Sequence, residues 1–258
     1  LLAHVKNLVV DEADTLMDPS WITETHSVIR KLKNLNHLIF CSATIPNEFN
    51  KTITKLFPSY IPITTTRLHK LPRKLEFKII DSSLNPFKGS KMKALAQILY
   101  AVNKDDSENG FQKRCVVFVN ERDEVTRIVD NLRNKYGLNA MGLTGSNKVE
   151  ERLETIKLFT SAPKLISDAN KESKLKIVDS DVVIGETLTI PGSNITITTS
   201  KGTDNGNNVP SKSSIILVTT DLMARGLNFQ GLRNVILFDV PQTSIDLVHR
   251  AGRTARMR

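Results

Sequence analysis

The sequence predicts an α/β protein built on parallel sheets, because short buried strands alternate with amphipathic helices along most of its 258 residues. Two strands are continuous apolar runs, Leu8–Val10 and Cys115–Val119, a pattern typical of parallel strands covered on both faces. Several expected strands lead directly into polar or charged residues. Open α/β sheets bind their ligands at the carboxyl ends of strands, so these residues are candidates for a functional site.

The first part of the chain contains two expected strands, and each ends at a polar motif. A strand over 4–10 precedes Asp11-Glu12-Ala13-Asp14, and a strand over 37–41 precedes Ser42-Ala43-Thr44. Between them, a helix is expected with one apolar face. A second helix is expected over 47–56, and extended backbone over 61–63. The apolar face of the first of these two helices comprises Trp21, Thr25, Val28, Ile29 and Leu32.

A second series of strands and helices begins at Lys91. Its apolar stripes predict three helices and its β-branched runs predict four strands, which together imply a second parallel sheet. The helices are expected from 91, over 122–136 and over 149–159, and the strands over 114–119, 140–143, 215–219 and 234–238. The inner faces of the first two helices are Met92, Leu95, Ala96, Leu99 and Val102, and Val125, Ile128, Val129 and Leu132.

Residues 161–213 interrupt this alternation. They are rich in Ser, Thr, Asn and Lys, and their lysines balance their acidic residues. Alternating side chains over 181–184 and 194–198 allow a small hairpin, whereas Pro191, Gly192 and an Asn/Gly-rich tail favour a partly disordered insertion. A docking site for a partner is the alternative interpretation.

The formal net charge of +9 favours a polyanionic partner. The longest apolar runs have the length of a strand, far below the roughly 20 residues of a spanning helix, so no membrane span is expected. The two cysteines, Cys41 and Cys115, fall on strands expected to be buried. We therefore expect small core side chains in a reducing compartment and no disulfide.

Two further motifs complete the pattern. Thr220-Asp221-Leu222-Met223-Ala224-Arg225-Gly226 follows one strand of the second series, and His249-Arg250-Ala251-Gly252-Arg253-Thr254-Ala255-Arg256 lies near the end of the chain. With the two earlier motifs, and in the same order, they resemble the later motifs of the DEAD-box RNA helicases.

The resemblance implies an α/β fold of two RecA-like parallel-sheet domains. The chain contains no Gly-x-x-x-x-Gly-Lys-Ser/Thr loop and reaches its acidic motif within eleven residues. We therefore expect a first domain truncated at its N-terminal side over 1–66 and a linker and entry segment over 67–90. A nearly complete second domain follows over 91–258, with the insertion at about 161–213.

The resemblance gives the first domain the metal and the water chemistry of ATP hydrolysis. Asp11 would hold Mg²⁺ through water, Glu12 would align and deprotonate the attacking water, and Asp14 would bond across the site. The residues Ser42, Ala43 and Thr44 would couple nucleotide state to domain closure. Taken alone, the acidic motif could equally be a helix N-cap, and the second motif a strand-end cap.

The last motif supplies positive charge. By resemblance, Arg253 and Arg256 are arginine fingers, which share a face at positions i and i+3. His249 and Arg250 would complete contacts to the γ-phosphate region and to the acidic motif. Hydrolysis would then require the domains to close. The alternative is a basic surface turn on RNA.

The remaining assignments concern RNA and the nucleotide ribose. The resemblance places Thr220, Gly226, Gly145 and Arg152 on the RNA backbone and makes Arg225 a coupling residue. Asn228 stands where the family has an aspartate on the ribose, and an amide oxygen can still accept a hydrogen bond. Thr144 replaces the histidine of the family's His-Gly loop. These departures predict altered ribose and RNA contacts.

The resemblance therefore implies an ATP-dependent RNA helicase that uses ATP and Mg²⁺ and couples RNA-stimulated hydrolysis to remodelling of RNA duplexes or ribonucleoproteins. Structured or ribosomal RNA is the expected partner. The composition and the divergent motifs resemble fungal mitochondrial members that act in ribosome assembly, which implies the mitochondrial matrix, with the nucleus or cytoplasm as alternatives. Without a phosphate loop, we expect the chain by itself to be inactive.

Two alternatives of different class stay open. One is a catalytically weak RNA clamp or assembly factor of the same fold, suggested by Asn228 and Thr144. The other is a DNA-directed helicase of the same superfamily, which the acidic and Ser-Ala-Thr motifs disfavour. RNA-stimulated ATPase activity separates the first from an active helicase, and competition by duplex DNA tests the second.

Overall fold

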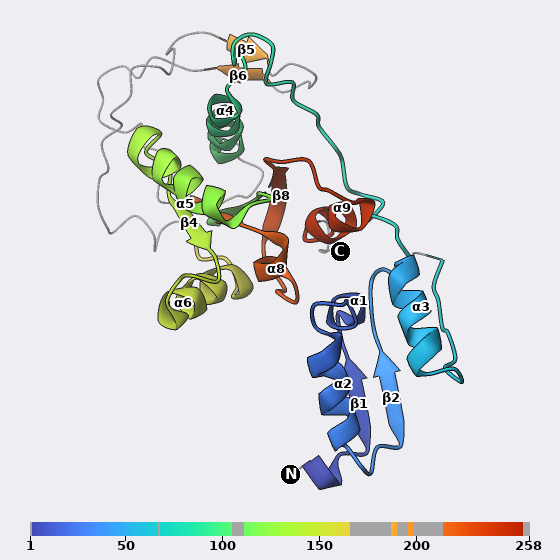
Figure 1. The fold of residues 1–258 in the computed structure, drawn as a ribbon. Coiled ribbons are helices and arrows are strands. Elements are labelled where there is room, and N and C mark those ends of the chain that lie inside the picture. The colour runs from blue at the N-terminus through green and yellow to red at the C-terminus, as the bar shows by residue number, and fades with distance from the viewer. Residues whose placement is uncertain are drawn as a thin grey trace. The chain divides into compact units, whose positions relative to one another are not determined.

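The computed structural model describes residues 2–66, 68–104, 111–165, 187–189, 196–198 and 214–254 (Figure 1). The chain divides into two compact units. The first unit comprises Leu1–Leu71 with Thr243–His249, and the second comprises Pro72–Gln242 with Arg250–Arg258. Each unit is described in turn.

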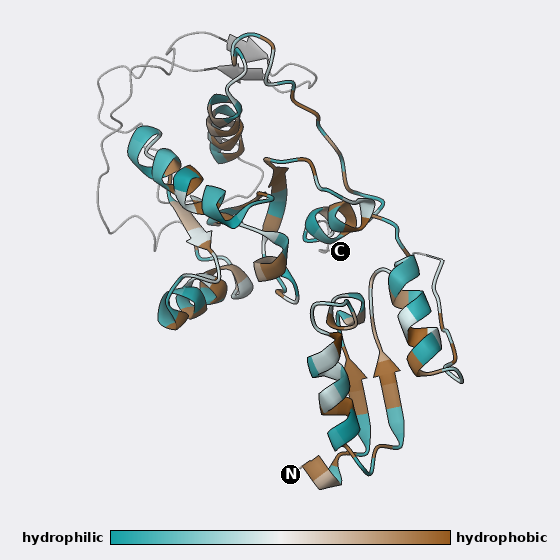
Figure 2. Ribbon diagram, in the orientation of Figure 1, coloured by the Kyte–Doolittle hydropathy of each residue, from teal (hydrophilic) through white to brown (hydrophobic). Residues whose placement is uncertain are grey.

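The first unit is built on two parallel strands. Leu8 pairs in register with Leu38, and Val10 with Phe40. Polar side chains begin both strands and apolar ones end them (Figure 2). Both expected strands and both expected helices are confirmed. The elements are a 3₁₀ turn Leu2–His4, strands β1 (Asn7–Val10) and β2 (His37–Phe40), and helices α1 (Ala13–Leu16), α2 (Ile22–Lys31) and α3 (Asn47–Leu56).

Burial in the first unit differs from the expectation. Val9 and Ile39 pair in register and so share a face of the sheet, yet they are 57% and 49% exposed. The prediction that both faces of β1 are covered is therefore wrong for the described residues. Alternate strand side chains point to opposite faces, and Val10 on the other face is buried.

Two further burial predictions are wrong in the first unit. Trp21 and Val28, expected on the inner face of α2, are exposed, whereas Leu32 is buried. No residue of α2 itself is fully buried; Thr25 and Ile29 are half-buried, and Leu32 lies just beyond the end of the helix. Cys41 is exposed because it lies just beyond the end of β2, while Cys115 is buried within a strand of the second unit.

The second unit contains a four-stranded sheet in the order β4-β7-β3-β8, and every pair in it is parallel. This confirms the predicted parallel sheet. Its strands are β3 (Lys113–Phe118), β4 (Ala140–Leu143), β7 (Ser214–Thr219) and β8 (Leu232–Leu237). Its helices are α4 (Lys91–Lys104), α5 (Arg122–Asp130), α6 (Val149–Thr160) and α8 (Asp221–Ala224), and α9 (Ser244–Ala251) extends across the division between the units.

Helices pack on both faces of this sheet. Cys115, Val117 and Val119 of the central β3 strand region contribute to the core beneath α4 and α5. Val116 and Phe118 point the other way, into a core shared with α6 and α8. The buried run of β3 therefore fits a strand covered on both faces, as its continuous apolar sequence predicted.

Several elements were not predicted. A π turn, Asn131–Lys135, continues α5 within the single helix expected over 122–136. The short helices α1 and α8 follow β1 and β7 directly, and α9 carries the first three residues of the last motif, His249–Ala251. One turn of helix gives too few positions for a periodic signal, which explains why α1 and α8 were missed.

Two short strands, β5 (Thr187–Thr189) and β6 (Thr196–Thr198), pair antiparallel. The second overlaps the predicted strand over 194–198, whereas the predicted strand over 181–184 lies outside the described residues. The predicted disorder of the rest of 161–213 also falls outside them, apart from the beginning at 161–165. Among the described helices, none combines the length and apolar character that crossing a bilayer requires.

We expect Leu99→Ala to lower the free energy of unfolding of the second unit by about 2 to 5 kcal/mol, because Leu99 is fully buried. Hydrogen exchange of the β3 amides under mild denaturant measures this change. Leu153→Ala on α6 is the matched control, since Leu153 is 61% exposed and its loss should change stability by less than about 0.5 kcal/mol. Equal effects would contradict the core assignment.

Candidate active site

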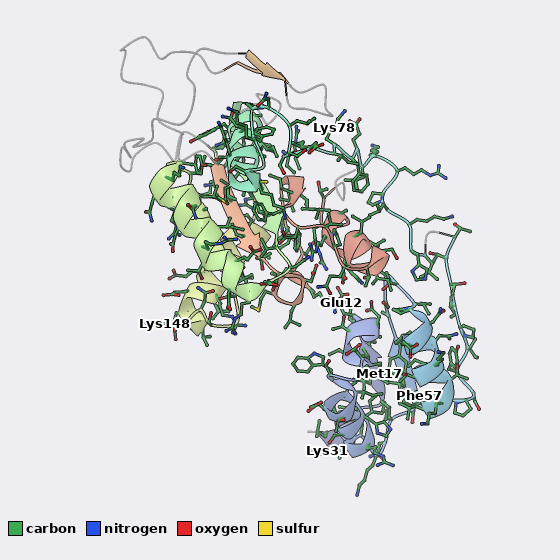
Figure 3. All side chains as sticks on the ribbon, turned by 45° about the horizontal axis from the view of Figure 1, so that its top comes forward. Glu12, Met17, Lys31, Phe57, Lys78 and Lys148 are labelled. Atoms are coloured by element: carbon green, nitrogen blue, oxygen red, sulfur yellow. The ribbon has the colours of Figure 1, made fainter. Side chains whose placement is uncertain are left out.

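The acidic motif forms a tight turn after β1 (Figure 3). The Glu12 N–H donates to Asp11 Oδ1 at 2.9 Å, and Glu12 adopts the left-handed conformation, with φ 50° and ψ 43°. This conformation is rare for a residue with a side chain. It is held by the buried Ala13, whose N–H donates to the Cys41 carbonyl at 3.0 Å. That bond ties the acidic motif to the segment leading into the Ser-Ala-Thr motif.

A buried polar cluster follows within the first unit. Thr44 Oγ1 donates to Asp14 Oδ2 at 2.5 Å, and His249 Nε2 lies 3.1 Å from the same oxygen and 3.2 Å from Thr44 Oγ1. Since an ionised carboxylate only accepts, His249 Nε2 must carry a proton and donate. The side chains of Asp14 and His249 are 4% and 5% exposed, so this cluster is withdrawn from water.

The pKa of Asp14 falls to about 2 in this setting. Burial by itself raises the pKa, but hydrogen bonds from His249, Thr44 and Ser42, together with the charge of His249, outweigh it. Asp14 is therefore an anion held by its donors. Because its Oδ2 accepts from both the second and the fourth motif, Asp14 fixes their positions relative to the acidic turn.

The cation preferences of this cluster can be judged from its atoms. Glu12, Asp14 and His249 place one potential ligand atom each within 4.8 Å of one another. Mg²⁺ prefers oxygen ligands, and a set that includes imidazole nitrogen suits it poorly. Asp11 fits Mg²⁺ better, because it is exposed and one of its two oxygens is used by the Glu12 N–H. Asp11 is therefore a better candidate for holding Mg²⁺ than the cluster of Glu12, Asp14 and His249.

In the second unit, Arg250 makes a buried ion pair. Its Nε donates to Asp221 Oδ1 at 2.7 Å and its Nη2 to Asp221 Oδ2 at 2.6 Å. Further bonds reach Asn120 Oδ1 at 2.6 Å and the Asp239 carbonyl at 3.2 Å, and the guanidinium lies 5.7 Å from the centre of the Phe118 ring. Arg250 is 2% exposed. These four hydrogen bonds are all made within the second unit, so they do not support a direct contact between Arg250 and phosphate.

Asp239 extends this network. Its side chain pairs with Lys91 at 2.9 Å and accepts the Asn120 N–H at 3.1 Å. Burial raises the pKa of Asp239, but Lys91 and the Asn120 N–H outweigh it and lower the pKa below 3.8. Asp221, Asp239 and Lys91 were not among the predicted site residues. Asp239 could have been found by the rule that located the other motifs, since it follows the end of β8.

Arg253 and Asn228 line one cavity of about 500 Å³ in the second unit. Phe111, Pro163 and the backbone around Gly231 form its other walls. Arg253 Nη1 also donates to the Leu227 carbonyl at 3.0 Å. Two residues predicted to meet the nucleotide thus share a cavity large enough for part of a small ligand.

The predicted RNA residues lie on turns after strands. Thr220 precedes α8, and Gly226 follows it with φ 72°, where a Cβ would be strained. Among the described residues other than the two chain neighbours of each glycine, no heavy atom lies within 4 Å of a Cβ built on Gly226 or Gly145, so a ligand could approach either backbone. Arg225 ends α8, and the Arg152 N–H bonds to the Lys148 carbonyl in the first turn of α6.

The loop that carries Thr144 is closed by its own side chains. The Thr144 hydroxyl donates to Asn147 Oδ1 at 2.8 Å and lies 2.9 Å from Ser146 Oγ. The Thr144 N–H also donates to Asn147 Oδ1. Thr144 is 5% exposed, so its hydroxyl orders the loop around Gly145 and does not project as a ligand group.

Comparison with known proteins identifies relatives along the whole chain. The model of the helicase conserved C-terminal domain matches residues 198–258. The mitochondrial ATP-dependent RNA helicase MRH4 of Vanderwaltozyma polyspora is 58% identical over the entire chain, and that of Saccharomyces cerevisiae strain S288c is 56% identical. The chain is thus similar, along its whole length, to mitochondrial ATP-dependent RNA helicases. It spans 47% and 45% of the length of these two relatives.

Solved structures of the helicase family share the fold. Dbp5 of Saccharomyces cerevisiae bound to RNA and ADP BeF3 matches with a TM-score of 0.62 at 16% identity, covering 99% of this chain and 51% of that one. The DEAD-box helicase Mss116 bound to ssRNA and UDP-BeF gives 0.61 at 17% identity, covering 99% and 42%. These matches show the α/β RecA-like fold, with parallel sheets, over about half the length of each helicase.

Among the predicted site residues, the structure brings Asp14, Thr44 and His249 into one cluster and places Glu12 beside it. Ala43 and Ser42 follow β2, and the Ser42 hydroxyl accepts the Thr44 N–H at 3.1 Å. Arg253 and Asn228 come together separately in the second unit. Arg256 lies outside the described residues.

We expect Arg250→Met to destabilise the second unit by about 3 to 5 kcal/mol, because it leaves Asp221 partly buried without its cation. Hydrogen exchange of the β3 amides reports the loss. Adding Asp221→Leu should recover part of it. Arg127→Met is the control, since the pair of Arg127 with Glu124 is exposed at the arginine, and it should cost at most about 1 kcal/mol. Additive effects of the two core changes would argue against a coupled pair.

The Asp14 cluster predicts a pH dependence of the first unit. The folded pKa of about 2 lies below the ordinary 3.8, so the stabilisation is complete above pH 3.8 and is lost as the pH falls towards 2. Over this window, we expect unfolding followed by the single Trp21 to lose about 2 kcal/mol more in the native chain than in Asp14→Asn. Glu48→Gln is the control, because that carboxylate is 81% exposed. Parallel pH curves for all three would refute the assignment.

Proposed function

We propose that the protein containing this chain is an ATP-dependent RNA helicase, which couples RNA-stimulated ATP hydrolysis to remodelling of RNA duplexes or ribonucleoproteins. The observation that carries the proposal is the buried cluster in which Asp14 accepts hydrogen bonds from Thr44 and His249. Three of the four helicase motifs meet in it. A helicase needs such a link, because hydrolysis and remodelling must depend on each other.

The proposal applies to a longer protein than the chain analysed, since the helicases it matches are about twice as long. Within it, the first unit would be the C-terminal part of the ATP-binding RecA-like domain, residues 1–66. Residues 67–90 would be the linker and entry segment. Residues 91–258 would form the second RecA-like domain, with the insertion at about 161–213.

The residues of the first unit would act on water and on the metal-bound nucleotide. Mg²⁺ would screen the phosphate charge when bound, and Asp11 would hold its hydration shell. Glu12 would orient the attacking water and accept its proton. Asp14 would take no proton in this scheme, because its donors already keep its pKa near 2. Its role is to keep the acidic turn, Thr44 and His249 in register.

The second unit would supply positive charge to the transition state. Arg253 and Arg256 are proposed as the arginine fingers, and Asn228 as the ribose contact. The role of Arg250 differs from the first expectation. Its fork is occupied by Asp221 and Asn120, so we assign it as a positioning residue that holds the arginine-bearing end of α9 on the sheet.

RNA would be held through its backbone, with little base specificity. Thr220 and Gly226 would contact phosphates beside α8, and Gly145 and Arg152 would do so at the start of α6. The exposed backbone at Gly226 and Gly145 supports this assignment, because neither would clash with a close phosphate. Arg225 is proposed as a coupling residue between nucleotide and RNA.

The cellular role is proposed from the relatives, which are named as mitochondrial helicases. We infer that the protein acts in the mitochondrial matrix on structured or ribosomal RNA, in the assembly of ribosomal particles. A catalytically weak RNA clamp is the alternative. It is favoured by Asn228 in place of an acidic ribose ligand and by Thr144, whose hydroxyl is turned into its own loop.

In the full-length gene product, we expect Arg253→Ala to reduce RNA-stimulated ATP turnover by about 10³-fold or more, because an arginine finger stabilises the charge of the phosphoryl transition state. A phosphate-release assay with saturating RNA measures this. Arg122→Ala is the control, since Arg122 is a largely exposed arginine of the same unit. Turnover of the native protein no higher than that of Arg253→Ala would support the clamp.

A further inference from the structure

A basic groove runs along helix α2 in the first unit, apart from the motifs described above. It encloses about 560 Å³, with Ile22 and Leu56 as its apolar walls. Five polar residues line the rest: Thr23, His26, Ser27, Arg30 and Lys31. Figure 3 marks Lys31 at the end of α2 and Phe57 just beyond the end of α3. We call this surface the α2 groove.

The polar residues of the α2 groove form a continuous strip. They occupy positions i+1, i+4, i+5, i+8 and i+9 relative to Ile22, which is one face of a helix. At a rise of about 1.5 Å per residue, the strip from Ile22 to Lys31 is about 14 Å long. The hydroxyl groups of Thr23 and Ser27 therefore lie at one end and in the middle of the strip. The permanent cations Arg30 and Lys31 lie at its other end.

The cations of the α2 groove have no ion-pair partner within the described part of the chain, and none of the described lining residues is a carboxylate. Across the residues that the structure describes, no hydrogen bond or ion pair is recorded for the side chains of His26, Arg30 or Lys31. Protein surfaces commonly interleave charges of both signs, so a groove with cations alone attracts an anion.

We propose that the α2 groove binds the phosphate backbone of RNA, as a second contact site outside the helicase motifs. Five of its seven lining residues are of the types that donate to phosphate oxygens: Arg, Lys, Ser, Thr and His. An acidic peptide is the weaker match, because peptide docking relies on apolar anchors and only Ile22 and Leu56 supply apolar walls.

This site differs from the RNA contacts proposed above in place and in chemistry. Those contacts lie in the second unit and use exposed backbone, whereas the α2 groove lies in the first unit and uses side-chain charge. Backbone binding through cations carries no sequence information. The groove would therefore hold a flanking segment of a long or structured RNA without selecting its sequence.

The test is RNA binding by the full-length protein in which Arg30→Gln and Lys31→Gln are combined. Affinity for a labelled oligouridylate of about 30 nucleotides is measured between about 50 mM and 200 mM salt without nucleotide. Each lost phosphate contact lowers the slope of log affinity against log salt by about 0.7 for a single strand, so we expect a slope reduced by about 1.4. The affinity difference between the native protein and the variant should therefore be about sevenfold larger at 50 mM salt than at 200 mM.

The control variant is Lys51→Gln with Lys55→Gln. These two exposed lysines lie on α3 in the same unit, outside the groove lining, and their loss removes the same formal charge. The salt slope of this variant should stay close to that of the native protein. Photo-crosslinking of the native protein to RNA containing 4-thiouridine should label residues 22–31. Thermal unfolding followed by circular dichroism checks that both variants are folded.

Equal slopes for the groove and control variants, with no crosslink to α2, would overturn the inference. So would binding of polyglutamate by the native protein that is lost in the groove variant while RNA affinity stays the same, which would indicate an acidic protein partner. The outcome is separable from the helicase proposal. Loss of turnover in Arg253→Ala tests the helicase alone, and the salt slope measured without nucleotide tests the groove alone.

Discussion

The guanidinium of Arg250 joins the carboxyl ends of three neighbouring strands of the second unit. Asn120 follows β3, Asp221 begins the helix after β7, and Asp239 follows β8, and Arg250 bonds to all three. A buried charge is tolerated only when it is paired and its donors are satisfied. The position of the arginine motif on this sheet therefore depends on one ion pair and the carbonyl and amide oxygens around it.

The first unit also buries a charged group and satisfies it with hydrogen-bond partners, but there the charge is negative. Asp14 is a buried anion, and its donors come from the residues that follow β2 and from His249. In both units, polar groups sit where parallel strands end, since there the backbone turns away and leaves room for side chains. Partners of opposite charge then offset the cost of burying these groups away from water. The buried groups in turn hold the motif residues in fixed positions for catalysis.

The sequence predicted most of the elements, because helices such as α3 and α4 and strands such as β4 carry clear periodic signals. It could not predict how donors are shared. Arg250 and Arg253 belong to one motif, but only the structure shows that Arg250 is occupied by Asp221. Whether Val9 is buried also depends on which residues pack against it, and the apolar pattern of the strand does not indicate this. The motif residues were predicted from the resemblance, whereas the α2 groove could be found only in the three-dimensional structure.

A second buried arginine holds the chain at the end of α6, where the predicted insertion begins. Arg114 is 2% exposed, and its Nη atoms donate to the carbonyls of Ser161, Ala162 and Gln230. These bonds satisfy the end of α6 and anchor the chain where the predicted insertion begins. The Gln112 N–H adds a bond to the Lys164 carbonyl at 2.8 Å. Because the entropic cost of closing a loop grows only slowly with its length, an insertion that starts from this fixed point would be compatible with the sheet.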